Sequence, residues 1–187
     1  MLVPAGPLCD GEPTQRTGPT TRGRPSRGGP DQRLLDGQVR DDAGQWNRVI
    51  GTLSGKLTAE LPEGDEFPVG NVKFAEAEAL CRRLTELGHQ SGGLPTDWEV
   101  RLPTEAQWEY ACRAGTTRAT SFGNQLSSRQ ANFRGRPYNG APPGPSLNRA
   151  TRVGSYSANA WSLHDMHGNS FEWCRDWYHA RLPGVRT

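Results

Sequence analysis

The stretch Leu163-His-Asp-Met-His-Gly-Asn-Ser-Phe-Glu-Trp-Cys-Arg-Asp-Trp-Tyr178 sets two carboxylates, Asp165 and Glu172, around a Gly-Asn turn and among four aromatic side chains. Such a mixture is costly to bury unless its polar groups have fixed partners. Calcium takes oxygen ligands from carboxylates and from turned backbone carbonyls, and this spacing supplies both. The alternative is a capped turn followed by an aromatic strand, with no ligand. Spacing alone leaves both interpretations open.

Two histidines flank Asp165 in the same stretch. His164 and His167 have i, i+3 spacing, which would suit a transition metal if a third His or Cys stood at a sensible distance, and none does. The alternative is that both are turn residues donating to backbone carbonyls. The chain has no G-x-S-x-G, H-E-x-x-H, P-loop or G-x-G-x-x-G motif. We therefore predict no catalytic residue from these motifs.

Size and charge limit the function further. The chain has 187 residues, which is enough for one domain with a hydrophobic core. Its net charge of +2 gives no reason to expect a nucleic-acid or membrane partner. No apolar run approaches the roughly 18 residues of a membrane span. The apolar residues 1–5 are too few for a signal-peptide core, so a cytoplasmic location is the default expectation.

The first 33 residues are rich in Gly, Pro, Thr and Arg and hold almost nothing that could fill a core. This composition predicts a disordered or eroded arm at 1–33, with the folded domain at 34–187. A basic arm that contacts RNA is the alternative, but its arginines lack interleaved aromatic residues.

The four cysteines lie far apart, without a C-x-x-C pair, at Cys9, Cys81, Cys112 and Cys174. This spacing excludes a zinc ribbon and a thioredoxin-like redox motif. Most of them sit on apolar faces or beside aromatic residues, where a free Cys behaves as a small hydrophobe. We predict buried thiols rather than disulfides.

Three helices are predicted from apolar spacing. A short one covers Ala43–Ile50. The second carries an apolar stripe from Ala77 to Leu87, with Asn71 as its cap and Gly88 as its end.

The third helix starts at a Thr104/Gln107 capping box and stops near Gly115. From residue 115 to 160 no helical period exists. So long a stretch without repeating structure usually signals a functional loop surface or bound ions.

Several segments resemble, in order, the formylglycine-generating enzyme (sulfatase-modifying factor) family. The two long ones are Arg101-Leu-Pro-Thr-Glu-Ala-Gln-Trp-Glu-Tyr-Ala-Cys-Arg-Ala-Gly115 and Asn159–Tyr178; the shorter ones are Phe67–Val72, Phe122–Asn124, Ala131–Phe133 and Arg152–Ser155. The resemblance runs from about residue 34 to 178. It implies an α+β, C-type-lectin-like fold with little regular secondary structure and long loops that calcium helps to organise.

The resemblance also implies metal ligands. One calcium site would fall on the Asp165 and Glu172 side chains with backbone oxygens near Gly168 and Ser170. Another would use Asn132 and the backbone of Phe133, and its expected downstream carboxylate is missing, since residues 138–152 contain no Asp or Glu.

The family's activity is oxidation of a sulfatase cysteine to formylglycine, with oxygen and a copper ion held by two cysteines. That pair follows an Arg-Gly-Gly-Ser-Trp-like segment, which is absent before Thr187. The resemblance therefore predicts a C-terminally truncated family domain, with a sulfatase or another protein or peptide as partner and without the copper ligands. The alternatives are a non-catalytic lectin-like binding module and an inactive fragment. Related iron-dependent sulfoxide synthases would need a His triad that the sequence does not supply.

Overall fold

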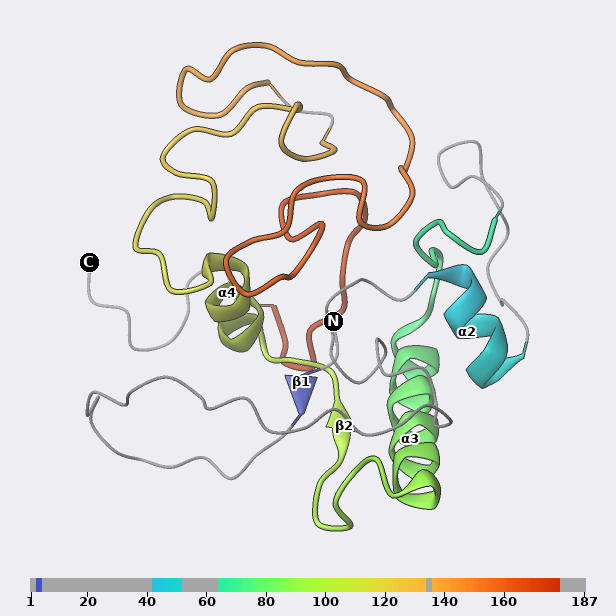
Figure 1. The fold of residues 1–187 in the computed structure, drawn as a ribbon. Coiled ribbons are helices and arrows are strands. Elements are labelled where there is room, and N and C mark those ends of the chain that lie inside the picture. Colours follow the sequence, from blue (N-terminus) through green and yellow to red (C-terminus); the bar gives the residue numbers. More distant parts are fainter. Residues whose placement is uncertain (1–2, 5–41, 52–63, 134–135, 179–187) are drawn as a thin grey trace, which may run out of the picture.

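The computed structural model describes residues 3–4, 42–51, 64–133 and 136–178 (Figure 1). In these ranges the elements run β1 (Val3–Pro4), α2 (Ala43–Ile50), α3 (Phe74–Ser91), β2 (Val100–Arg101) and α4 (Glu105–Arg113). The two short strands pair antiparallel. The expectation of an α+β fold with little regular structure is confirmed.

Helix α2 has the bounds that its apolar spacing predicts. Asp42 starts it, because its Oδ1 accepts from the Gln45 amide at 2.6 Å while the Gln45 side chain accepts from the Asp42 amide at 3.2 Å. This reciprocal box satisfies two of the amides that a helix start leaves open. Trp46, 2% exposed, projects from α2 into the core.

Helix α3 is longer than predicted, and both predicted ends are wrong. It begins after Lys73, while Asn71 adopts a left-handed conformation (φ 57°) in the preceding turn. Gly88 lies inside the helix, and Gly92, with φ 70°, ends it. Gly88 is needed for packing instead: a Cβ there would stand 2.8 Å from the Leu94 Cβ, because the chain turns back across the helix at this point.

The first core cluster joins α2, α3 and the connection to β2. Its buried members are Trp46, Leu80, Cys81, Leu84, Leu94 and Val100. The Thr85 hydroxyl links α3 to β2: it donates to the Cys81 carbonyl and accepts from the Val100 amide, both at 2.9 Å. The strand β2 is thus fixed against α3.

Helix α4 has the predicted capping box, with Thr104 Oγ1 accepting from the Gln107 amide at 3.2 Å. It ends at Ala114, which takes the left-handed conformation (φ 48°) one residue before the predicted Gly115. Its inner face builds the second cluster, in which Ala111, Cys112, Leu163 and Met166 are buried and Trp108 packs against them.

The described residues beyond α4 form loops without helices or paired strands, as the missing period predicts (Figure 1). Isolated bridges join Thr120 to Gly123 and Leu126 to Tyr138. The aromatic strand expected as the alternative for the end of the 163–178 stretch is wrong: residues 171–178 are irregular, and Phe171 is fully exposed.

None of the described helices has the length and apolar character to cross a membrane. The predicted arm 1–33 falls outside the described ranges except for Val3–Pro4, which pair with β2. Residues 34–41 and Cys9 also lie outside these ranges.

Candidate functional site

The two longest family-like segments are bound to each other through α4. The Trp108 indole donates to the Glu172 carboxylate, 64 residues along the chain. At the start of the helix, the Glu105 amide donates to Asp176 at 2.9 Å, and the Arg175 amide donates to the Pro103 carbonyl at the same distance. A carboxylate at this end complements the positive end of the helix dipole. The 163–178 stretch is therefore held along one helix.

Asn159 closes the other end of α4. It is 9% exposed, and its Nδ2 donates to the Ala111 carbonyl at 2.8 Å. Its Oδ1 accepts from the backbone amides of Trp161 and Leu163. One buried amide side chain thus satisfies the helix end and shapes the turn that delivers Leu163 to the second cluster.

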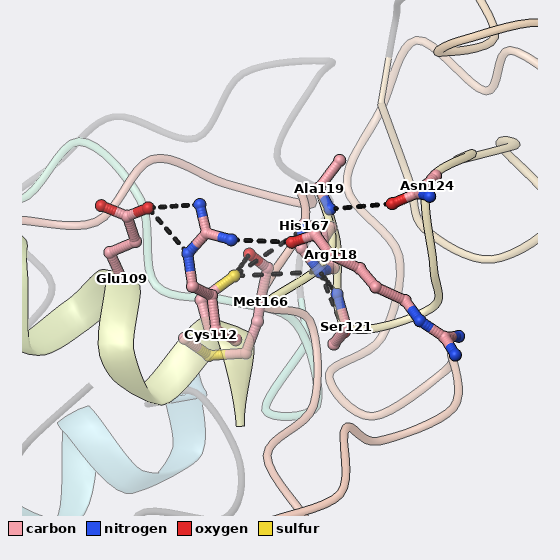
Figure 2. Close-up of polar contacts among 9 residues, drawn as sticks. Glu109, Cys112, Arg118, Ala119, Ser121, Asn124, Met166 and His167 are labelled. Atoms are coloured by element: carbon pink, nitrogen blue, oxygen red, sulfur yellow. Dashed lines mark hydrogen bonds and ion pairs between the residues drawn. The ribbon is translucent and has the colours of Figure 1, made fainter. Parts of the chain in front are cut away.

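A cysteine, a histidine and a serine meet at the inner end of α4 (Figure 2). The Ser121 amide and hydroxyl contact His167 Nε2 at 3.2 and 2.9 Å. Because the amide can only donate, Nε2 is the acceptor and the ring proton lies on Nδ1. Cys112 Sγ is 3.7 Å from Nδ1 and donates to the Met166 carbonyl at 3.4 Å.

Burial shifts the ionisation of this group. It lowers the pKa of His167, which favours the neutral ring. Burial, together with the nearby Glu172 charge, raises the pKa of the Cys112 thiol from 9.0 to about 11. A neutral imidazole and a protonated thiol form a satisfied packing element, because nucleophilic chemistry needs a thiolate.

The two histidines of the 163–178 stretch therefore differ. His164 Nδ1 contacts the Tyr156 carbonyl at 2.8 Å, as expected for a turn residue. For His167 that expectation is wrong, since its ring contacts Ser121 and Cys112. In the described part of the chain no three His, Cys, Asp or Glu side chains are grouped so that they could hold a metal ion.

The turn at Gly168 lies directly against Asn132. The Asn169 amide donates to the Asn132 carbonyl at 2.7 Å, and a Cβ on Gly168 would stand 2.2 Å from that oxygen. The Asn132 side chain donates to Asn169 Oδ1 at 3.0 Å. Residues predicted for two separate calcium sites, Asn132 and Gly168, are thus neighbours.

Asn169 is a structural residue that the sequence interpretation missed. Its Oδ1 accepts from the Thr151 amide and hydroxyl at 2.8 and 3.0 Å, and its Nδ2 donates to the Thr151 carbonyl. Its backbone φ is 73°. The Gly-Asn pair predicts such a turn. No local sequence pattern predicts that Asn169 binds Thr151, which is 18 residues away.

The two predicted calcium carboxylates lie in different surroundings. Asp165 is 7% exposed, and its Oδ2 accepts from the Gly154 amide at 2.7 Å. Together with Asn132 and Gly168 it lines a cavity of about 10 Å³, at the limit of what one water molecule occupies. Glu172 does not line this cavity and faces the Trp108 indole instead. The calcium ligands, Ser170 and Phe133 included, stay predictions.

The described cysteines do not fit a copper pair. Cys81 belongs to the first core cluster and Cys112 to the second. Cys174 is half-buried, and burial raises the pKa of its thiol. All three are free thiols, and the predicted burial is confirmed for Cys81 and Cys112. Cu(I) is held by thiolates. Cys81 and Cys112 lie in different clusters, and burial favours the protonated thiols of Cys112 and Cys174.

Comparison with known proteins decides the family. The model of the sulfatase-modifying factor enzyme 1-like domain matches residues 35–184. The chain belongs to this family. The formylglycine-generating enzyme of Streptomyces coelicolor is 39% identical over 150 residues, covering 75% of this chain and 41% of that protein.

Other relatives of the family domain have different names. The inactive C-alpha-formylglycine-generating enzyme 2 of Bos taurus is 28% identical, over 76% of this chain and 42% of its own length. The serine/threonine-protein kinase pkn1 of Chlamydia caviae is 42% identical over 79 residues, 42% of this chain and 11% of the kinase. The chain thus spans from about a tenth to less than half of the length of these three relatives.

A solved structure shares the fold. Treponema denticola variable protein 1 superposes with a TM-score of 0.53 at 21% identity, covering 79% of this chain and 64% of that chain. At this identity the likeness concerns the fold alone.

Proposed function

We propose that this chain is the scaffold part of a formylglycine-generating domain, and that the protein to which the domain belongs oxidises a cysteine of a sulfatase or another protein substrate. The observation that carries the proposal is the contact between the two longest family-like segments, in which Trp108 of α4 binds Glu172 and the Arg175 amide binds the Pro103 carbonyl. The segments that resemble the family in sequence thus support one another in space.

In this proposal the described residues position the scaffold and do not carry the oxidation. Copper, when bound, supplies oxygen activation at the substrate thiol. Cys81 and Cys112 lie in separate clusters, and burial favours the protonated thiol of Cys112, so the copper ligands have to come from outside the described residues.

The test is to supply this chain with Cu(I), oxygen and a cysteine-containing sulfatase peptide, and to assay the peptide for aldehyde with a hydrazide probe. A copper-bound formylglycine-generating enzyme is the positive control. We expect neither stoichiometric copper on this chain nor an aldehyde. Tight copper binding that is lost in Cys112→Ser would contradict the proposal that the copper ligands come from outside the described residues.

A non-catalytic binding module is the second candidate function. It is favoured by the same protonated, buried thiols, and a relative bears the name of an inactive enzyme. The C-type-lectin-like fold expected from the resemblance fits the long loops beyond α4. This candidate gains if the same domain in its longer protein context also yields no aldehyde.

We also propose that calcium binds near the 165–172 turn. Oxygen donors of the kind that calcium prefers are gathered here, with the buried Asp165 carboxylate beside the Gly168 turn and the Asn132 carbonyl. A cation bound to the folded state alone raises the melting temperature.

The calcium test separates charge from hydrogen bonding. Asp165→Asn and Glu172→Gln remove one negative charge each and keep a carbonyl acceptor, and Asn tolerates the positive φ of residue 165. Trp108→Phe is the matched control, since it removes the indole donor and leaves both carboxylates. We expect calcium to raise the melting temperature of the parent and Trp108→Phe, and less in the two amide variants. Equal gains in all four proteins would overturn the assignment.

A further inference from the structure

An open groove of about 620 Å³ lies among the loop residues 122–130 and 139–142. Four residues with amide side chains line it, together with Phe122 and Arg129. The amides are those of Asn124, Gln125, Gln130 and Asn139. A concave site of this size with a few fixed polar groups is typical of a ligand pocket.

Two of the amides are anchored through their nitrogen. Gln125 Nε2 donates to the Asn139 carbonyl at 3.0 Å, and Asn139 Nδ2 donates to the Asn124 carbonyl at 2.9 Å. A carbonyl can only accept, so these contacts fix which end of each amide is nitrogen. The side-chain oxygens of both residues are left to accept from a ligand.

The other two amides are anchored through their oxygen. Asn124 Oδ1 accepts from the Ala119 amide at 3.4 Å, and Gln130 Oε1 accepts from the Ser127 amide at 2.9 Å. Their NH₂ groups are therefore left to donate. The groove thus offers both acceptors and donors on side chains that are already held, which reduces the entropy lost on binding.

Next to the lining residues Gln125, Ser127 and Asn139, the backbone is already paired. Leu126 and Tyr138 exchange both hydrogen bonds, at 2.8 and 3.3 Å. An extended peptide that adds itself as a strand needs amides and carbonyls that are free to pair. At this bridge, Leu126 and Tyr138 already use these groups for each other. The recognition chemistry here belongs to side chains.

The charged and apolar residues of the groove indicate which class of ligand it would bind. Among the described residues that line the groove, Arg129 alone is ionisable. Its side chain makes no hydrogen bond or ion pair to any described residue. Apart from Phe122, whose ring is tilted against His167 at 5.6 Å, the apolar lining comes from Ala141 and Pro142.

We propose that this groove binds a saccharide with an acidic sugar unit, whose carboxylate pairs with Arg129. Each sugar hydroxyl both donates and accepts, which suits the mixture of free amide oxygens and NH₂ groups. A carboxylate on a guanidinium is a charge-assisted pair, stronger than the bonds between neutral groups. The proposal is independent of copper, calcium and formylglycine formation.

The test is calorimetric titration of the whole chain with trigalacturonate and with a neutral galactose trisaccharide. Arg129→Gln removes the charge without disturbing any hydrogen bond of the described structure, and Gln125→Ala removes an amide. Arg82→Gln and Gln90→Ala, exposed on α3, are the matched controls.

We expect saturable binding of trigalacturonate that Arg129→Gln and Gln125→Ala each weaken about tenfold, equivalent to about 1.4 kcal/mol. The control variants should bind like the parent, and Arg129→Gln should leave the weaker binding of the neutral sugar unchanged. Absence of saturable binding in the parent, or equal affinity in Arg129→Gln and the parent, would overturn the proposal. The proposal would also be overturned if the chain bound a cysteine-containing peptide and neither sugar, and if Gln125→Ala weakened the binding of that peptide.

Discussion

At the scale of single residues, Asn169 shows how one side chain can hold two loops together. Its amide joins Asn132 to Thr151 while its backbone stays left-handed. The sequence indicates a turn at this residue. The loops that the turn joins lie 37 and 18 residues away, beyond the reach of any local pattern.

Two substitutions separate the effect of the Asn169 side-chain hydrogen bonds from the effect of its left-handed backbone conformation. Asn169→Gly keeps the positive φ and loses the side-chain bonds, which we expect to lower the free energy of unfolding by about 1–3 kcal/mol. Asn169→Ala should lose about 1 kcal/mol more, because alanine resists the left-handed conformation. Urea unfolding measures both. Equal stability of the two variants would mean that backbone strain plays no part.

Cys112 should make the protein less stable in alkali. Its folded pKa of about 11 lies above the ordinary 9.0, so between these values the unfolded chain loses a proton that the folded chain keeps. The free energy of unfolding then falls as pH rises from 9 to 11. Cys112→Ser keeps a hydroxyl donor and should show a shallower decline in urea titrations. An identical slope would show that this thiol is not protected by burial.

His167 should act at the opposite end of the pH range. Burial lowers its pKa below 6.5, so as pH falls below 6.5 the unfolded chain takes up a proton before the folded chain does. The free energy of unfolding therefore decreases toward acid. In His167→Gln, whose side-chain oxygen still accepts from the Ser121 amide, this decrease should be smaller. A variant as acid-sensitive as the parent would contradict the assignment.

At the scale of elements, the short helices depend on their caps. Helix α4 has only nine residues, too few to be stable alone in water. Its capping box was predictable because Thr104 and Gln107 are three residues apart. The ends of α3 were not, because Gly88 serves the packing of Leu94 and leaves the helix stop to Gly92.

Removing the cap of α4 gives an element-scale prediction. Thr104→Ala loses the acceptor for the Gln107 amide and should lower the free energy of unfolding by about 1 kcal/mol. Thr104→Ser keeps the hydroxyl and serves as the control. Thermal unfolding of the two variants measures the difference. A serine variant as unstable as the alanine variant would mean that the threonine methyl group, rather than the cap, matters.

At the scale of the whole molecule, the helical part and the loops are joined by long-range bonds. The Val153 amide donates to the Glu66 carbonyl at 2.8 Å, and the Trp173 indole donates to the Val72 carbonyl at 2.9 Å. These contacts connect the segment before α3 with the loops beyond α4. The two core clusters should therefore unfold together.

Substitution in one cluster tests this coupling. Leu84, 3% exposed, lies in the first cluster, and Leu84→Ala should cost about 2–5 kcal/mol. We expect far-UV circular dichroism, which reports the helices, and tryptophan fluorescence to shift by the same amount. Met166→Ala in the second cluster is the counterpart. Two separate transitions in either variant would show that the clusters fold independently.

The sequence by itself determined the bounds of α2, the capping box of α4, the loop stretch beyond it, the free thiols and the family. These features depend on spacings of a few residues or on long motifs read in order, which need no knowledge of the chain's path. The tertiary structure alone decided that Trp108 meets Glu172, that Asn132 lies against Gly168, and that four amides share one groove. Loop residues have no periodicity that fixes their partners, so these contacts follow only from how the packed helices and turns bring distant segments together.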